Sequence, residues 1–314
     1  MRQQRTGSTA LLAALALTVL PEVSLAGQGP GDIVFVVSDY MNSGSVVSGT
    51  GQDMKIKTLI EPFAYIAHGA LTALPEEDKI DLKEFERDYY GKDRQYKLVA
   101  AGKDVGTVKV RASAFDIQCV SLAASASASP SSFVSGMRMA LATNAAVRDL
   151  GYIRRDATAL EKGAFEGLVR GVYTRNSVKE SIAAKAQTQS LTAIEGPAGV
   201  ILVGSSMTTE NVVQNTYDSN GQVAGTAPAT VVNSVFLIAE KGADGRYHGS
   251  YSWFNSGSDN TFQSRNFVDV LGLDGDATPE IVTQFNYSEA TEYHVYKRSD
   301  GKWVDYFKNE GSGC

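Results

Sequence analysis

The sequence has few of the residue types that build common catalytic and metal sites. Among 314 residues there are only two cysteines, three histidines and two tryptophans. Neither cysteine lies in a Cys-x-x-Cys pair, and no two histidines have the spacing of a zinc protease. The sequence also lacks a Gly-x-Ser-x-Gly elbow, a P-loop and a Gly-x-Gly-x-x-Gly motif between a strand and a helix. We therefore predict no catalytic residue.

Charge and hydropathy place the chain among ordinary globular proteins. Hydrophobic residues make up 43% and charged residues 20% of the sequence. With 29 basic and 35 acidic residues, the formal net charge is −6, which argues against non-specific nucleic-acid binding. No apolar run reaches the length of about 20 residues that a membrane helix needs.

The N-terminus has the three parts of a secretory signal. Arg2 and Arg5 form a basic start, residues 10–20 are apolar, and Ser24 and Ala26 are the small residues of a cleavage site. A membrane anchor is the alternative, but the apolar stretch is too short for one. We predict a signal peptide over residues 1–26 and a soluble product, either periplasmic or extracellular.

The two cysteines, Cys119 and Cys314, are far apart in the sequence. An even number of cysteines in an oxidising compartment favours an intramolecular disulfide between them. The alternative is a buried Cys119 with Cys314 unpaired or in an intermolecular bond.

Local patterns predict several elements before residue 189. Residues 96–112 alternate around Gly102 and predict a β-hairpin. The Ala/Ser-rich residues 121–132 predict a linker, or a strand that runs into one. Residues 136–150 and 156–173 predict helices, the second with Asp156 as its N-cap and with glycines spaced for close approach to a neighbour.

The C-terminal part contains a weak internal repeat. Residues 191–203 align without gaps on residues 270–282, which places Glu195 on Asp274. Each copy is followed by a hairpin with an Asp-Gly turn, at Asp244 in the first copy and at Asp300 in the second. The first copy is longer because it contains the polar residues 208–233. The repeating unit is predicted to be strand, acidic turn, strand and hairpin.

The turn of the second copy resembles the acidic loop of FG-GAP and VCBS-type repeats. Its residues 272–280 read Gly-Leu-Asp-Gly-Asp-Ala-Thr-Pro-Glu. The resemblance covers residues 266–308, and more faintly 190–252. Such repeats are blades of β-propellers in exported and surface proteins.

This resemblance implies a calcium site in the loop. The implied ligands are Asp274, Asp276, the Thr278 carbonyl and Glu280, which are oxygen ligands of the kind that Ca²⁺ prefers. Gly272 occupies the first acidic position, so the alternative is a plain turn, with Asp269 too early in the sequence to replace the missing ligand. We predict no metal at the first copy.

Three aromatic residues of the C-terminal part are candidates for a ligand surface: Trp253, Tyr293 and Trp303. Aromatic residues that alternate in strands either pack in a core or form a face that stacks on a carbohydrate or peptide. We interpret His248 and His294 as residues on sheet surfaces.

Together these patterns predict an α+β protein. It would have a β-rich part (27–120), the linker (121–132), a helical middle (133–188) and a C-terminal antiparallel sheet of two FG-GAP-like units, resembling part of a propeller (189–314). The predicted function is a non-enzymatic binding or structural protein with FG-GAP-like repeats, whose acidic loop is either a weak Ca²⁺ site or a plain turn. Its partner would be an unknown protein or glycan of the cell envelope or exterior, and not nucleic acid. The alternative is a secreted hydrolase of a glycan or peptide, with its site in a cleft.

Overall fold

The computed structural model describes residues 31–38, 58–76, 79–113, 122–134, 139–217, 219–258, 261–272, 278–287 and 290–313. The strands are β1 (Asp32–Ser38), β2 (Leu59–Ala67), β3 (Ala70–Thr72), β4 (Gln95–Ala100), β5 (Lys103–Ser113), β6 (Ala124–Ser129), β7 (Ala140–Thr143), β8 (Ile153–Asp156), β9 (Gln187–Gly196), β10 (Gly199–Tyr217), β11 (Val223–Lys241), β12 (Tyr247–Gly257), β13 (Ser264–Leu271), β14 (Glu280–Asn286), β15 (Ala290–Ser299) and β16 (Lys302–Gly313). The helices are α1 (Leu82–Tyr89), α2 (Ala159–Arg175), α3 (Glu180–Ala183) and the short 3-10 helix η3 (Ser131–Phe133).

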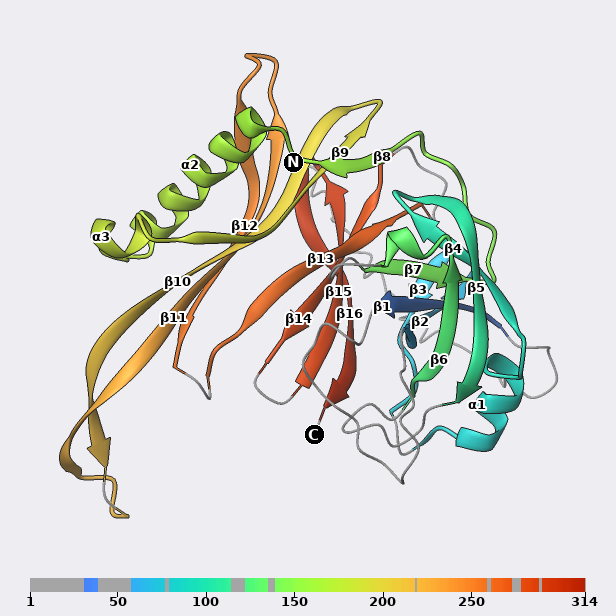
Figure 1. Ribbon diagram of the computed structural model, residues 1–314, viewed down its shortest axis with the longest axis horizontal. Helices are drawn as coiled ribbons and strands as arrows, with labels where there is room; N and C mark the ends of the chain where they lie inside the picture. The colour runs from blue at the N-terminus through green and yellow to red at the C-terminus, as the bar shows by residue number, and fades with distance from the viewer. Residues whose placement is uncertain are drawn as a thin grey trace, which may run out of the picture.

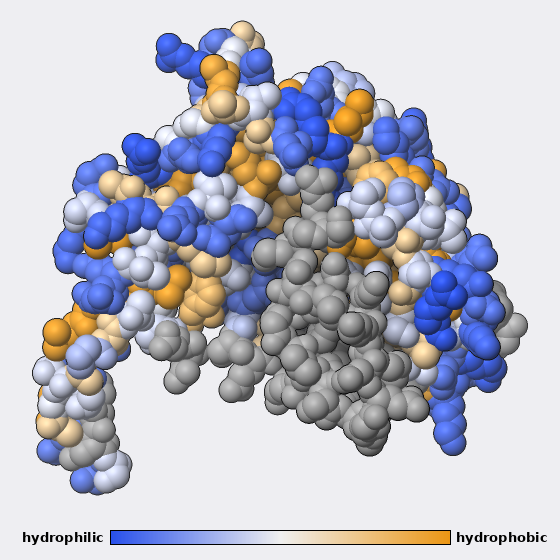
Figure 2. All heavy atoms as spheres, in the orientation of Figure 1, coloured by the Kyte–Doolittle hydropathy of each residue, from blue (hydrophilic) through white to orange (hydrophobic). Residues whose placement is uncertain are grey.

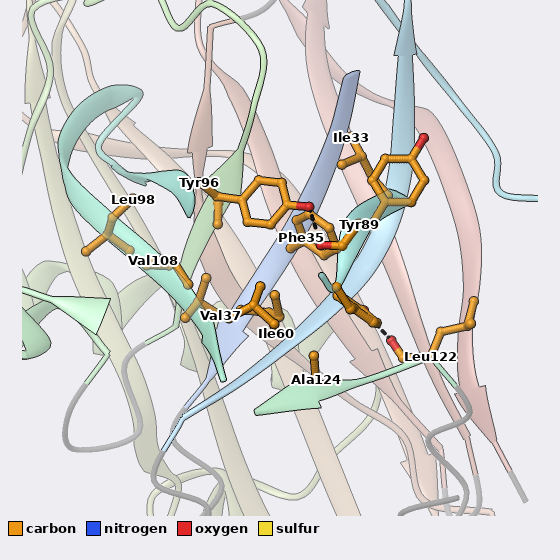
Figure 3. Packing of buried hydrophobic residues seen from close by; sticks show 14 of the residues in the cluster. Ile33, Phe35, Val37, Ile60, Tyr89, Tyr96, Leu98, Val108, Leu122 and Ala124 are labelled. Atoms are coloured by element: carbon orange, nitrogen blue, oxygen red, sulfur yellow. Dashed lines mark hydrogen bonds between the residues drawn. The ribbon is translucent and has the colours of Figure 1, made fainter. Parts of the chain in front are cut away.

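The N-terminal strands form a closed antiparallel barrel of six strands. Their order is β1-β7-β4-β5-β6-β2, a β1–β2 pairing closes the ring, and β3 extends β2. Apolar side chains fill the interior, among them Phe35 and Leu98, and α1 adds Phe85 and Tyr89 (Figure 3). The predicted hairpin of residues 96–112 is confirmed as β4 and β5, and its turn at Ala101 and Gly102 has positive φ at both residues.

The remaining strands form two antiparallel sheets. The outer sheet has the order β12-β11-β10-β9-β8, and the central sheet has the order β13-β14-β15-β16. In both sheets each strand pairs with the next strand along the chain. The two Asp-Gly hairpins predicted from the sequence are those of β11–β12 and β15–β16.

The elements pack as four layers (Figure 1). Helix α2 covers one face of the outer sheet through Phe165, Val169 and Tyr173. The other face of the outer sheet packs on the central sheet, and the second face of the central sheet packs on the barrel. The central sheet is therefore buried on both faces, which explains why consecutive residues such as Ile281 and Val282 are both fully buried.

The two sheets stack with the same orientation. The sequence alignment places Leu202 of β10 on Ile281 of β14. Leu202 faces α2, and Ile281 faces the outer sheet. Equivalent faces thus point the same way. Leu202 pairs with Ala193, nine residues earlier, whereas Ile281 pairs with Val270, eleven residues earlier. The gapless sequence alignment therefore does not hold on both sides of the turn.

The predicted α+β fold with a helical middle is wrong, because the structure is mostly β. Within residues 133–188, the predicted helix of 136–150 is replaced in its described part by β7, a barrel strand between β1 and β4. A helix does form in the second predicted segment. It is α2, and its N-cap is Thr158 rather than Asp156.

The linker expected over residues 121–132 includes β6, which pairs with β5 and β2 in the barrel wall. The alanines at 124, 126 and 128 pack on the barrel core, and the intervening serines alternate with them. An alternation with a period of two is the pattern of a strand, here formed by small residues. The predicted boundary between domains therefore falls inside one barrel.

Helix α2 begins in a network of charged hydrogen bonds around the buried Glu161. The carboxylate of Glu161 accepts from Arg155 at 2.7 and 2.8 Å, from the Thr158 amide at 2.8 Å and from the Tyr247 hydroxyl at 2.9 Å. The hydrogen bonds from Arg155, with smaller contributions from Thr158 and Tyr247, hold the pKa of Glu161 far below its usual range.

This network predicts a loss of stability in acid. Because the pKa of Glu161 is lower in the folded protein, its contribution is complete above the unfolded pKa of about 4.5 and is lost as the pH falls below that value. Urea unfolding at neutral pH and at about pH 3 should show a smaller difference for Glu161→Gln than for the wild type. Glu166→Gln, the same change on the same helix, serves as the control, and an equal pH dependence in all three proteins would refute the prediction.

Candidate functional site

The predicted calcium loop lies only partly within the described residues. Asp274 and Asp276 fall outside them, Thr278 precedes β14, and Glu280 begins β14 with 2% of its surface exposed. In the part of the chain that the structure describes, no group of three or more His, Cys, Asp or Glu side chains is placed to hold a metal ion. Calcium binding therefore stays a prediction.

The carboxylate of Asp269 forms hydrogen bonds within the protein. Its carboxylate accepts from Arg154 at 3.0 Å, from the Ala101 amide at 2.8 Å and from the Val270 amide at 2.8 Å, and it is fully buried. It joins β8, the β4–β5 turn and the central sheet, and it is a structural residue.

The signal peptide over residues 1–26 and both cysteines also fall outside the described ranges. The disulfide between Cys119 and Cys314 stays a prediction.

Two of the three predicted ligand-surface residues lie in the core. Tyr293 is 1% exposed and Trp303 is 5% exposed. Tyr293 faces the barrel, where its hydroxyl donates to Glu61 at 2.8 Å, and Trp303 packs between the outer and central sheets. Only Trp253 is partly exposed.

Trp253 forms part of an aromatic cage around Arg265 that the sequence analysis missed. The Arg265 guanidinium lies 4.7 Å from the ring centroid of Phe285, 5.1 Å from that of Trp253 and 5.4 Å from that of Tyr296. It donates to the Tyr251 hydroxyl at 3.0 Å and to the Tyr296 hydroxyl. Burial lowers the pKa of Arg265. In the sequence Arg265 stands between the polar residues Ser264 and Asn266, so the local pattern does not predict its burial.

His294 lies beside this cage and is not the surface residue that we expected. It is 6% exposed, with Nδ1 at 2.7 Å from Asp305 and Nε2 at 3.1 Å from Glu292. Burial alone would raise the pKa of Glu292, but hydrogen bonds from Lys308, Tyr287 and His294 hold that pKa below its usual value. Both ring nitrogens of His294 face carboxylates, so neither is open to a substrate in this arrangement. His248, by contrast, is exposed and pairs with Asp244 at 3.0 Å.

A projecting hairpin is the most prominent surface feature. Strands β10 and β11 each have 19 residues, but the pairing with β9 ends at Met207 and the pairing with β12 ends at Val232. Residues 208–217 and 223–231 therefore pair only with each other. We call residues 208–231 the arm. Figures 1 and 2 show it as a narrow projection from the body of the molecule.

The arm exposes apolar side chains as well as backbone. Val213 is 73% exposed and Val223 is 59% exposed. From sequence alone, residues 208–233 form a polar insertion for which no strand is predicted. The frequent threonine and valine residues in this stretch, which favour strands, were the missed signal.

No helix in the described ranges is long and apolar enough to cross a membrane. Comparisons with protein-family models, curated proteins and solved structures find no match. The resemblance to FG-GAP repeats therefore rests on the sequence pattern around residues 272–280.

Proposed function

We propose that the protein is an exported, non-enzymatic binding or structural protein that engages its partner through the arm. The observation that carries this proposal is the pair of strands that continue beyond β9 and β12. A strand without a neighbour presents a row of backbone N–H and C=O groups. An extended segment of a partner protein can add to such an edge by β-augmentation.

An isolated two-stranded hairpin is only marginally stable in water, so a partner strand would also stabilise the arm. The partner belongs to the cell envelope or exterior, in keeping with the export signal. The hydrolase alternative requires two carboxylates that face each other across a cleft. Glu292 and Asp305 instead contact the ring of His294.

Shortening the arm tests this function. Thr209 and Val232 pair directly, so residues 210–231 can be replaced by an Asn-Gly turn between them. We expect the wild type to co-sediment with the envelope fraction of its source cells, and the shortened protein to stay in the supernatant. The melting temperature of the shortened protein checks that the sheets are intact. Equal sedimentation of two folded proteins would contradict the proposal.

We also propose that the loop at Asp274, Asp276, Thr278 and Glu280 binds Ca²⁺ weakly, which the resemblance to FG-GAP loops supports. Binding to the folded state alone adds about 2.7 kcal/mol at a ligand concentration of 100 times Kd. We expect a higher melting temperature in millimolar Ca²⁺ than in EDTA, and no such shift in a variant with Asp274→Ala and Asp276→Ala. The absence of a shift in the wild type would identify the loop as a plain turn.

A further inference from the structure

We propose that the partner of the arm is a second copy of this chain, joined through the free edge of β10. This inference rests on the proposed function and narrows it: the exported partner protein that adds to the arm is another copy of the same chain. The two β10 edges would pair antiparallel around a two-fold axis. Antiparallel edge pairing of identical strands is self-complementary, as the symmetry of a dimer requires.

The two edges of the arm differ in how open they are. Natural proteins protect edges with lysine, proline, bulges or inward charges. On β11, Pro228 lacks the backbone N–H and interrupts the row of donors. On β10, residues 208–216 contain no proline and no lysine, and the pairing with β11 is regular up to Thr216. The β10 edge is therefore the open one.

Charge does not oppose self-pairing at this edge. From residue 204 to residue 240 the chain has no lysine or arginine, and Glu210 is the only charged residue in β10. Lys179 of the same chain neutralises Glu210 at 2.6 Å. Two β10 strands from two copies can therefore pair without repulsion between like charges.

One register uses the exposed apolar residue of this edge. A two-fold axis through Val213 places Val213 opposite its copy, and Glu210 then lies opposite the uncharged Thr216. Within each chain, Val213 of β10 pairs with Pro228 of β11. Pairing would therefore bury two Val213 side chains, each 73% exposed in the single chain, against two prolines.

The arm also keeps the two bodies apart. The ten residues from 208 to 217 extend by about 3.3 Å each, so the arm reaches roughly 30 Å from the supported sheet. Without the predicted signal peptide, which contains Arg2, Arg5 and Glu22, each copy carries a formal charge of −7. The repulsion between the two bodies therefore acts over distance and is screened by salt. We therefore expect the dimer to tighten as salt is raised, the reverse of an interface held by opposite charges.

The test is the molar mass of the purified protein by sedimentation equilibrium between about 1 and 100 μM, a range that covers the modest affinity of a small interface. Val213→Lys places like charges opposite each other across the proposed axis. Ala243→Lys adds the same charge at an exposed residue of the β11–β12 turn, far from the arm, and is the matched control. Thermal melting confirms that both variants fold.

We expect a monomer–dimer equilibrium for the wild type and for Ala243→Lys, and a dissociation constant at least about tenfold higher for Val213→Lys. A wild type that stays monomeric at every concentration would overturn the inference, and so would a dimer that Val213→Lys leaves unchanged. If a monomeric wild type still co-sediments with the envelope through its arm, the proposed function stands without the dimer. If a dimer forms but nothing co-sediments, the dimer stands without the envelope partner.

Discussion

Replacing Asp269 with alanine is expected to lower the free energy of unfolding by about 3–5 kcal/mol, the usual loss when one partner of a buried ion pair is removed. Asp269 is fully buried, and the side chain of Arg154 is only 15% exposed. The substitution leaves the Arg154 guanidinium without its carboxylate, and it leaves the buried Ala101 amide without an acceptor.

Arg154 has further contacts that will hold it in place after the substitution. It donates to the carbonyls of Met139 and Val268 and lies over the ring of Phe267. The positive charge therefore cannot leave for solvent without breaking contacts to the barrel side and to the central sheet. Burial raises the pKa of Asp269, and Arg154 together with the amides of Val270 and Ala101 partly offsets that rise.

Urea unfolding at neutral pH would measure the effect. Asp244→Ala is the control, since Asp244 forms an exposed pair with His248, and exposed pairs contribute less than about 1 kcal/mol. If Asp269→Ala cost no more than Asp244→Ala, the ion pair would not hold the layers together. The double variant Arg154→Leu with Asp269→Leu should lose less stability than Asp269→Ala, because no unpaired charge remains.

Patterns that depend on neighbours in the sequence were predictable. The Asp-Gly turns at Asp244 and Asp300 and the hairpin around Gly102 were identified because a hairpin is a local structure. The helix over α2 was identified from the apolar spacing that includes Phe165 and Val169.

Long-range pairing was not predictable from local patterns. The barrel closes through β1–β2 and through β7, which pairs with β1 at residues more than 100 positions away. The alanines of β6 carry too little hydrophobicity to distinguish a strand from a linker. β6 forms a barrel strand because β5 and β2 lie on either side of it.

For the candidate sites too, the local pattern was predictable and the long-range packing was not. The aromatic residues of β12 to β16 could be recognised, but their burial follows from the outer sheet and the barrel, which cover both faces of the central sheet. Tyr293 and Trp303 point to opposite faces of that sheet, and both faces are covered. Local patterns likewise predict a surface position for His294, which the packed sheets bury.

Replacing Phe165 with alanine is expected to cost about 3–5 kcal/mol of unfolding free energy, the range for a large buried aromatic residue. Phe165 is fully buried between α2 and the outer sheet. Its ring lies over Gly204 of β10, where an added Cβ would come within 2.9 Å of the ring and 2.4 Å of the Ser190 carbonyl oxygen. Because Gly204 has no side chain, there is space for the Phe165 ring to pack on the backbone of β10.

Two further variants make this prediction specific. Gly204→Val should also destabilise the protein, by about 1–3 kcal/mol, because the valine side chain would occupy the space of the Phe165 ring. Gly163→Ala on α2 should instead stabilise it by up to about 1 kcal/mol, since no atom lies within 4 Å of the added Cβ and alanine favours the helix. Two of the α2 glycines expected to permit close packing, Gly163 and Gly167, have no atom within 4 Å of an added Cβ, and the glycine that permits close packing is Gly204 in the sheet. Chemical denaturation of the three variants would measure these changes. A Phe165→Ala protein as stable as the wild type would show that packing of α2 does not stabilise the face of the outer sheet that it covers.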